Sequence, residues 1–335
     1  MLKIKSGKDI DTIQWKQLAE QSSTATWFQT EDALSFYSSL PDLMESFCIY
    51  AVNDDLLRGV AVGYITKETS AIKQYFTRRA IIIGGPMLAD DITADELCEL
   101  LKAVRAELKR KAIYIETRNF NDYSRWKNQF EECGFSYVPH LNFHIDTTDE
   151  ETARERIGKH RWKYIRLSLR DGATLVEQPT KEQITEFYAL LSELYQTRVK
   201  TPLFPLSFFL KLAKVESSRF LLVEFDGKII GGTVCVCLMN KTIYEWFVCG
   251  NDNLYKGIRP SSVATWFGMQ YAAQHGYSRF DLMGAGKPDE AYGVRDFKAE
   301  FGGELVEHGR FLHINMPLLY NIGKLGVKIL KNKKS

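Results

Sequence analysis

The sequence predicts a two-domain α/β protein with mixed sheets, in which one structural unit occurs twice. The chain has 335 residues, which is too long for one ordinary hydrophobic core and suits two domains of about 150 residues each. Hydrophobic residues make up 45% and charged residues 26% of the chain, proportions typical of a soluble globular protein. The same order of predicted strands and helices appears in both halves, which indicates an internal duplication.

The first half is expected to contain a hairpin, a strand, a helix, a strand and a short segment with an apolar anchor. Period-2 alternation and continuous apolar runs indicate the strands, and leucines at helical spacing indicate the helix. Glycine and aspartate mark the turns between them. These elements lie at residues 47–52 and 57–64, 80–84, 93–111, 112–116 and 130–135.

The second half repeats this order. Asp226-Gly227 between two apolar runs is a strong hairpin signal. Pro260 and Ser261 mark the start of the predicted helix, and Gly276 marks its end. The elements lie at residues 220–225 and 229–238, 242–249, 261–275, 278–282 and 297–302. We therefore expect one domain at residues 1–148, completed by a C-terminal helix at 317–335, and a second at 149–316.

The segment that joins the halves, residues 146–171, begins with acidic residues and then becomes basic. On a single helix, its basic residues fall on nearly one face, opposite an apolar stripe. Such a face is either a solvated helix surface or a surface that binds phosphate or RNA. The basic residues are Arg156, Lys159, Lys163, Arg166 and Arg170.

Composition and charge exclude several classes of protein. The formal net charge of +2 shows no bulk positive field for duplex nucleic acid. No apolar run approaches the roughly 20 residues that a membrane-spanning helix needs, and we expect no signal peptide. The six cysteines lie in apolar segments, so reduced, buried thiols and a cytoplasmic location are expected. His140 and His144 fit alternate positions of one strand, and no metal site is predicted.

The most specific motif lies at residues 293–303, Gly-Val-Arg-Asp-Phe-Lys-Ala-Glu-Phe-Gly-Gly. It places Lys298 between Phe297 and Phe301, so that apolar anchors could hold one cation in place. At the corresponding position of the first half, Glu131 follows a phenylalanine. The two copies therefore differ chemically, and only the second is expected to react.

The duplicated unit resembles the GNAT fold, and the second half resembles the Fem-type (FemABX) peptidyltransferases. The resemblance covers most of the chain, and its most specific part is residues 271–303. It rests on Gly276-Tyr277, Phe280-Asp281 and residues 293–303, with weaker matches at 27–30, 159–170 and 195–209. Two departures concern the acceptor site: Val199 replaces an acidic residue, and Phe36 and Tyr37 occupy a region where some members carry a lysine.

The resemblance implies two tandem GNAT-like domains and an aminoacyltransferase of the EC 2.3.2 type. Such an enzyme transfers an amino acid from aminoacyl-tRNA to the peptide amine of a nucleotide-linked or lipid-linked peptidoglycan precursor. It implies no tightly bound cofactor and no metal. The sequence does not predict the amino acid transferred or the oligomeric state.

The resemblance also suggests catalytic roles for Lys298, Asp281 and Phe297. Lys298 could stabilise the tetrahedral oxyanion or the leaving ribose, or it could be structural. Asp281 ends a predicted strand, where open α/β sheets bind ligands. It could hold the acceptor ammonium and accept its proton, or it could cap the glycine loop that follows.

Further residues are assigned to binding. Arg198 could bind a phosphate or carboxylate of the acceptor bidentately, or could form a surface ion pair, and Trp246 could line the pocket or the core. The substrate-binding candidates are Arg198, Lys200, Tyr292, Arg295, Trp246, Glu245, Gln29 and Thr30. The candidates for binding the donor, RNA or phosphate are Lys159, Lys163, Arg166, Lys256 and Arg259.

Two other functions stay open on the sequence. One is an acyl-CoA N-acyltransferase that modifies an amino sugar or another small amine. Residues 256–261 could bind an anion at a helix N-terminus, although they lack the fuller Arg-x-x-Gly-x-Gly/Ala form of CoA-binding GNAT domains. The other is a non-catalytic module that binds a cell-wall precursor. The lysine-rich tail, residues 318–335, could dock on the first domain or contact the inner membrane surface.

Overall fold

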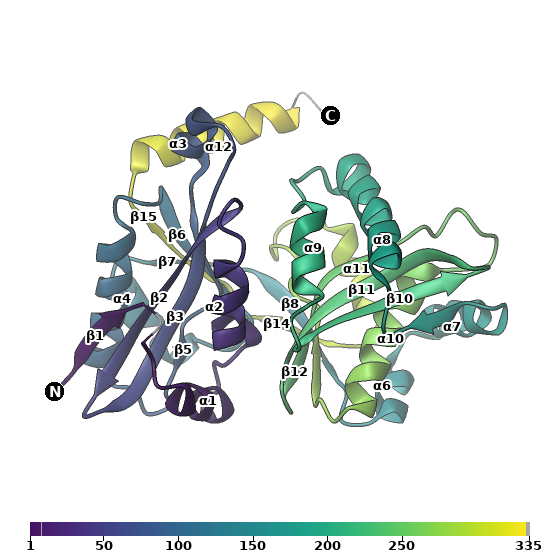
Figure 1. Ribbon diagram of the computed structural model, residues 1–335, viewed down its shortest axis with the longest axis horizontal. Coiled ribbons are helices and arrows are strands. Elements are labelled where there is room, and N and C mark those ends of the chain that lie inside the picture. The colour runs from purple at the N-terminus through teal and green to yellow at the C-terminus, as the bar shows by residue number, and fades with distance from the viewer. Residues whose placement is uncertain (8, 333–335) are drawn as a thin grey trace. The chain divides into compact units, whose positions relative to one another are not determined.

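The structure, a computed structural model, describes residues 1–7 and 9–332, with side chains as far as Lys324. The chain divides into two compact units (Figure 1). Unit 1 comprises Met1–Pro139 together with the chain from His308 onward, and unit 2 comprises His140–Glu307. Each unit is built around one mixed sheet, as the sequence predicts.

Unit 1 contains an eight-stranded sheet of order β1-β2-β3-β4-β6-β15-β7, with β5 paired to β3. The pair β4–β6 is parallel, and the other described pairs are antiparallel. The strands are β1 (Lys3–Ser6), β2 (Met44–Asn53), β3 (Leu56–Thr66), β4 (Ala80–Gly84), β5 (Met87–Leu88), β6 (Tyr114–Asn119), β7 (Ser136–Val138) and β15 (Arg310–Ile314). The helices are α1 (Thr12–Gln21), α2 (Glu31–Ser38), α3 (Ala71–Thr77), α4 (Ala94–Leu108), α5 (Lys127–Glu132) and α12 (Pro317–Asn332), with short 3₁₀ turns at Trp27–Gln29 and Ser124–Trp126.

Unit 2 contains a seven-stranded sheet of order β14-β8-β13-β12-β11-β10-β9, in which β12–β13 is the parallel pair. The strands are β8 (Leu141–Asp146), β9 (Thr174–Val176), β10 (Ser218–Phe225), β11 (Lys228–Leu238), β12 (Thr242–Gly250), β13 (Arg279–Asp281) and β14 (Glu304–Glu307). The helices are α6 (Glu150–Arg156), α7 (Lys159–Arg170), α8 (Lys181–Leu194), α9 (Leu206–Leu212), α10 (Pro260–Gln274) and α11 (Gly293–Ala299). A π-helical turn, Tyr195–Val199, follows α8.

The two sheets carry the same hairpin. The β2–β3 and β10–β11 pairs each contain one register shift near the turn. Each turn has two left-handed residues, Asp54 and Asp55 in unit 1 and Asp226 and Gly227 in unit 2. This geometry matches the right-handed twist of the strands that the turn joins. Strand, helix, parallel strand and short helix then follow in both units, which is the order of the duplication.

Helices α4 and α10 occupy corresponding positions in the two units but are buried to different extents. In α4 the predicted leucine stripe is buried, and a capping box between Thr93 and Glu96 satisfies the first turn. In α10 eleven of the fifteen residues are buried, so this helix lies inside the core of unit 2. Gly268 is needed there, because an added Cβ would lie 2.6 Å from the Phe280 ring.

Strand pairing places the boundaries between the units earlier than the predicted boundaries at 148/149 and 316/317. Strand β8 pairs with β13 and β14, so it belongs to unit 2. Strand β15 pairs with β6 and β7, so it belongs to unit 1. Each of these strands joins the sheet of a partner far away in the sequence, and its own residues do not encode which partner that is.

The predicted single basic helix is in fact two helices. Helix α6 ends at Arg156, Ile157 is extended, and α7 begins after Gly158. The Gly158 N–H donates to the carbonyl oxygen of Glu300 at 2.8 Å, outside any helix ladder. Arg156 therefore does not share a helix face with Lys159 and Lys163, and pairs with Asp146 at 3.2 Å.

Candidate active site

The candidate site lies where two strands of unit 2 part. Strands β12 and β13 pair only from Thr242 to Tyr244, although β12 continues to Gly250. Beyond this point β12 contains a bulge: Val234 pairs with Phe247 and Cys235 pairs with Glu245, so Trp246 is the extra residue. Parallel strands that diverge at their carboxyl ends form ligand crevices, and bulges are frequent beside active sites.

Lys298 reaches this point from α11. The residue is 9% exposed, and its Nζ donates to the carbonyl oxygens of Leu282 and, at 2.7 Å, Gly284. Between these carbonyls Met283 has a φ of 53°. Burial lowers the pKa of Lys298, whereas the charges of Glu245 and Asp281 raise it. The ammonium thus holds the turn after β13, and two of its three N–H donors are occupied.

Glu245 provides a buried carboxyl group beside this cation. It is 4% exposed and accepts a hydrogen bond from Thr233 Oγ1 at 3.3 Å. Burial raises the pKa of Glu245 to about 7, and the charge of Lys298 partly opposes this rise. The group can therefore gain or lose a proton near neutral pH, as a general acid or base must.

Asp281 is fully buried at the end of β13. Its Oδ1 accepts hydrogen bonds from Asn142 Nδ2 at 2.8 Å and from the Met283 N–H at 2.7 Å. Its Oδ2 lies 3.2 Å from Nε2 of His144. Burial, the largest influence, raises the pKa of Asp281, but His144, Arg279 and Asn142 together hold it below its ordinary value. Asp281 therefore both caps the glycine loop and orients a histidine.

His144 and Asn142 were not among the predicted site residues. Their side chains alternate along β8 and meet Asp281, because β8 pairs with β13 with His144 opposite Asp281. The His144 side chain is 12% exposed. The spacing of His140 and His144 on one strand was the available sequence signal for a histidine in the site. Only the antiparallel register of β8 and β13 brings the His144 imidazole to the Asp281 carboxylate.

Phe297, which is predicted to be catalytic, is partly buried and packs against the hydrophobic core of unit 2. Its ring packs against Phe301, with centroids 5.2 Å apart. The guanidinium of Arg161 lies 4.5 Å above the Phe297 ring, donates to Ser262 Oγ at 2.6 Å, and pairs with Glu300 at 3.1 Å. Phe297 thus anchors α11 and, through it, positions Lys298.

Arg295 and Trp246 also have structural partners. Arg295 donates from Nε to the carbonyl oxygen of Ala285 at 2.8 Å, and from Nη2 to those of Lys287 and Glu290. Its N–H donors therefore hold the loop that precedes α11, although the sequence predicts that Arg295 binds substrate. Trp246 is half-buried and lies edge-on to Phe208 at 5.4 Å, as part of an aromatic wall.

Three predicted substrate residues are exposed on the same unit. Tyr292 is 43% exposed at the start of α11. Burial raises the pKa of Tyr195, and nearby Tyr292 raises it further. Arg198 and Lys200 are exposed at the π-helical turn, where Lys200 has a φ of 58°. Among the described residues, no carboxylate forms an ion pair with Arg198, so its guanidinium faces solvent.

The structure places Gln29 in the core of unit 1, which corrects its predicted role in substrate binding. It is 0% exposed. Its Oε1 accepts from the Thr26 N–H at 2.6 Å, and its Nε2 donates to the carbonyl oxygens of Gly84, at 3.1 Å, and Gly85. Thr30 caps α2 and donates to the Trp27 carbonyl. In unit 1 a buried amide thus fills the break between β4 and β5.

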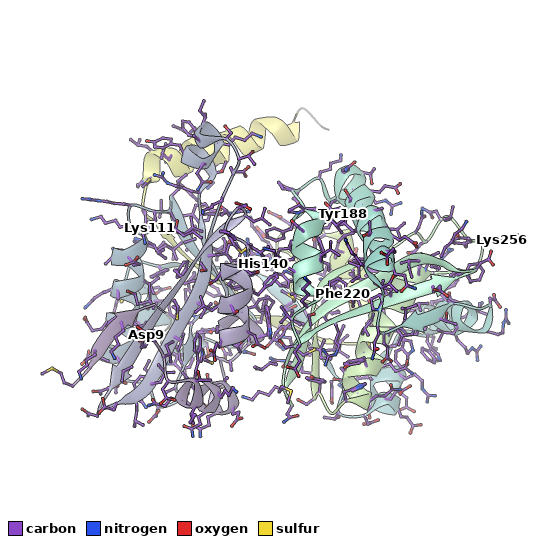
Figure 2. The ribbon with its side chains drawn as sticks, in the orientation of Figure 1. Asp9, Lys111, His140, Tyr188, Phe220 and Lys256 are labelled. Atoms are coloured by element: carbon purple, nitrogen blue, oxygen red, sulfur yellow. The ribbon has the colours of Figure 1, made fainter. Side chains whose placement is uncertain are left out.

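Four of the five predicted donor-binding cations are exposed on unit 2. Lys159, Lys163 and Arg166 are exposed on α7. Lys256 is exposed on the loop after β12 (Figure 2). Arg259 ties this loop to α7, because its N–H donates to Ser168 Oγ at 2.9 Å and its Nη1 donates to the Asp252 carbonyl at 2.7 Å.

The N-terminus of α10, a predicted anion site, already carries a carboxylate. Asp252 accepts hydrogen bonds from the Ser261 N–H at 3.0 Å and from the Ser261 hydroxyl. A side-chain carboxylate at this position satisfies the helix as a capping residue does. An incoming phosphate would have to displace it.

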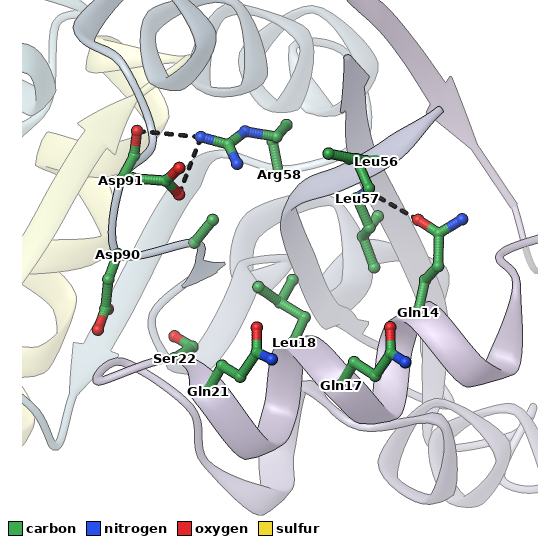
Figure 3. A pocket seen from close by; sticks show the side chains of 11 residues that line it. Gln14, Gln17, Leu18, Gln21, Ser22, Leu56, Leu57, Arg58, Asp90 and Asp91 are labelled. Carbon is green, nitrogen blue, oxygen red and sulfur yellow. Dashed lines mark hydrogen bonds and ion pairs between the residues drawn. The ribbon is translucent and has the colours of Figure 1, made fainter. Parts of the chain in front are cut away.

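Unit 1 contains a separate pocket of about 370 Å³ between α1 and the start of β3 (Figure 3). Gln14, Gln17 and Gln21 line one side of it, and Arg58 pairs with Asp91 at 3.0 Å on the other. None of the predicted site residues lines this pocket. Within residues 1–7 and 9–332, no group of three or more His, Cys, Asp or Glu side chains could hold a metal, and no helix is long and apolar enough to cross a membrane.

Residues 141–298 match the family model of an acetyltransferase (GNAT) domain. FemX has the same fold over 95% of this chain and 100% of its own, with a TM-score of 0.73 and 15% identity. The protein has a tandem GNAT fold. A tandem GNAT protein from the clavulanic acid biosynthesis pathway has a TM-score of 0.56 and 11% identity over 94% of this chain and 99% of its own.

L-PGS from Bacillus licheniformis is a further structural relative, with a TM-score of 0.56 and 16% identity over 95% of this chain and 98% of its own. Among curated proteins, no sequence matches the chain. At these identities the likeness establishes the GNAT-type acyltransferase fold, and the choice of substrate rests on the residues of the site.

Proposed function

We propose that this protein is a Fem-type aminoacyltransferase, which transfers an amino acid from aminoacyl-tRNA to the peptide amine of a peptidoglycan precursor. The observation that carries the proposal is the buried pair of Lys298 and Glu245 where β12 and β13 part. Unit 1 has Glu131 in place of the lysine, and its buried Gln29 donates to the carbonyl oxygens of Gly84 and Gly85 where β4 ends. The reaction is therefore assigned to unit 2.

The proposed reaction is aminolysis of an ester. The neutral acceptor amine attacks the carbonyl carbon of the aminoacyl group, a C–N bond forms, and the C–O bond to the ribose breaks. The proton of the acceptor ammonium passes to Glu245, whose pKa of about 7 suits a general base near neutral pH. Once the C–N bond has formed, the nitrogen loses a second proton, and the departing ribose oxygen takes up this proton.

Lys298 supplies the positive charge in this mechanism. Its ammonium is fixed by the Leu282 and Gly284 carbonyls, so it need not reorganise when the oxyanion forms. The third N–H donor is the one we assign to the oxyanion or the leaving oxygen. We assign Asp281 and His144 to orienting the acceptor amine beside it.

Two features of unit 2 favour a tRNA donor over a CoA thioester. The Asp252 carboxylate at the N-terminus of α10 repels a diphosphate at that position. The exposed cations are spread over α7 and the loop after β12, and such spacing suits the spaced phosphates of RNA better than one diphosphate.

The acceptor is assigned to the π-helical turn at the C-terminal end of α8. Arg198 is exposed and can bind a phosphate or carboxylate bidentately; Lys200 follows on the same turn, and Tyr292 is exposed on the same unit. This chemistry suits a nucleotide-linked or lipid-linked precursor. Because aminoacyl-tRNA is a cytoplasmic substrate, the proposal places the reaction in the cytoplasm.

The test uses the full chain with radiolabelled aminoacyl-tRNAs or radiolabelled acetyl-CoA, each with nucleotide-linked or lipid-linked precursor. We expect transfer from aminoacyl-tRNA, and Lys298→Met should lower kcat by about 100-fold or more, as loss of an oxyanion donor does. Lys214→Met, which removes an exposed cation after α9, is the matched control.

Transfer from acetyl-CoA alone would replace the proposal with acyl-CoA N-acyltransfer, which the description of the matching domain model favours. Absence of transfer from either donor, with the precursor still bound, would indicate a non-catalytic binding module.

A further inference from the structure

Helix α3 of unit 1 has an unusual composition for its exposure. It contains the residues Ala-Ile-Lys-Gln-Tyr-Phe-Thr, and none of them is buried. Ile72 is 75% exposed, Tyr75 49% and Phe76 42%, and the two aromatic rings pack against each other at 5.1 Å. A two-turn helix gains little stability from its own hydrogen bonds, so three large apolar side chains facing water need another explanation.

The start of α12 continues this apolar surface. Leu318 is 81% exposed and Ile322 54% exposed, and their spacing of four places them on one helix face. Helices α12 and α3 are in contact, and Figure 1 shows them together at one end of unit 1. Nη2 of Arg78, which follows α3, lies 3.6 Å from Sδ of Met316. We call Ile72, Tyr75, Phe76, Leu318 and Ile322 the apolar end of unit 1.

The charges around the apolar end are mostly positive; the exception beside α3 is Glu68, whose N–H donates to Gln74 Oε1 at 2.7 Å. Residues 70–79 contain Lys73, Arg78 and Arg79 and no acidic residue, and residues 308–335 contain no acidic residue at all. Lys324 is exposed and lies over the Tyr320 ring at 5.6 Å. The predicted membrane contact of the C-terminal tail also involves lysines at 328, 331, 333 and 334, whose side chains lie outside the described residues.

We propose that the apolar end of unit 1 docks on an anionic lipid bilayer. Exposed aliphatic and aromatic side chains on the outer faces of two helices suit insertion into the boundary between headgroups and acyl chains, and Tyr75 has the amphipathic ring favoured at that depth. The cations flanking them attract anionic headgroups. This inference is independent of the proposed reaction, since none of its residues lies in the site of unit 2.

The test is co-sedimentation of the full chain with sucrose-loaded vesicles of phosphatidylglycerol and phosphatidylcholine in equal amounts, or of phosphatidylcholine alone. We expect binding to the anionic vesicles that weakens at high salt. The variant Ile72→Gln/Phe76→Gln/Leu318→Gln should lose about 100-fold or more in affinity for the vesicles, because it buries less apolar surface in the bilayer. Lys73→Gln/Arg79→Gln should lose about 10-fold or more, mainly on anionic vesicles.

The matched control is Ile13→Gln/Leu56→Gln/Met239→Gln, which removes three exposed apolar side chains elsewhere and should bind as wild type does. Circular dichroism and the Tm show that each variant is folded. Wild-type protein that stays in the supernatant overturns the proposal. So does undiminished binding of the α3/α12 triple variant, which would assign the attraction to the lysine tail alone. A dimer in light scattering that this variant abolishes, without vesicle binding, would identify the surface as an interface between copies of the chain.

Discussion

The buried carboxyl group of Glu245 makes protein stability depend on pH in a way that one substitution isolates. Its pKa is about 7 in the folded protein against an ordinary value of 4.5. Because the folded value is the higher one, the folded protein binds the proton more tightly. The stabilisation is fully present below pH 4.5 and is lost as the pH rises through 7. At about 1.4 kcal/mol per pKa unit, the loss amounts to about 3 kcal/mol.

Glu245→Gln keeps the shape of the side chain and removes the titration. We compare Glu245→Gln with wild type by urea denaturation from pH 5 to pH 8. The free energy of unfolding of the variant minus that of wild type should be about 2.5 kcal/mol larger at pH 8 than at pH 5, since part of the stabilisation is already lost at pH 5. Taking the difference between two proteins cancels the other groups that titrate in this range. Glu216→Gln, which removes an exposed carboxylate after α9, should follow the wild-type profile.

The same substitution links stability to the proposed reaction. If Glu245 is the general base, Glu245→Gln lowers kcat at pH 8 while raising stability there, a combination that a purely structural residue would not produce. A stability difference between wild type and Glu245→Gln that stays constant from pH 5 to pH 8 would refute the reasoning about this carboxyl group.

Three further outcomes are expected. Gln29→Ala should lower the free energy of unfolding by about 3 kcal/mol, because it leaves buried backbone groups without partners. A loss below 1 kcal/mol in urea denaturation would contradict this. Gly268→Ala should cost about 1 kcal/mol, since overpacking against Phe280 at about 2 kcal/mol exceeds the helix-propensity gain of about 1 kcal/mol; a higher Tm than wild type would show that the ring has room to move. Maleimide should label native protein at Cys98 alone and all six cysteines in urea, and mass spectrometry of native protein should find no label on the buried thiols Cys48, Cys133, Cys235, Cys237 and Cys249.

Local patterns were sufficient for much of the fold. The Asp226-Gly227 turn between two apolar runs predicts the β10–β11 hairpin, and Pro260 and Gly276 bound α10 to within one or two residues. The repeated order of elements predicts two similar units, which the tandem GNAT fold confirms. These features depend on residues that are neighbours in the sequence, so their physical causes can be read from it.

The site could be predicted only in part. The motif around Lys298 points to the strand end where Asp281 lies, and Glu245 was included among the candidates. The anchoring contact of Phe297 with Phe301 follows from the motif. The burial of Gln29 was not predictable, because Gly84 and Gly85, whose carbonyl oxygens accept from it, are distant in the sequence. His144 was missed for the same reason, since its partner Asp281 is brought to it by strand pairing.

The sequence by itself determined that this protein has two α/β units, that they are copies, and that only the second carries a lysine at its motif. The tertiary structure decided which sheet β8 and β15 join, what Lys298 binds, and that Glu245 is buried enough to titrate near neutral pH. The physical reason is that turn and helix signals act over a few residues. Strand partners and desolvation, in contrast, depend on which distant segments the whole chain brings together in its core.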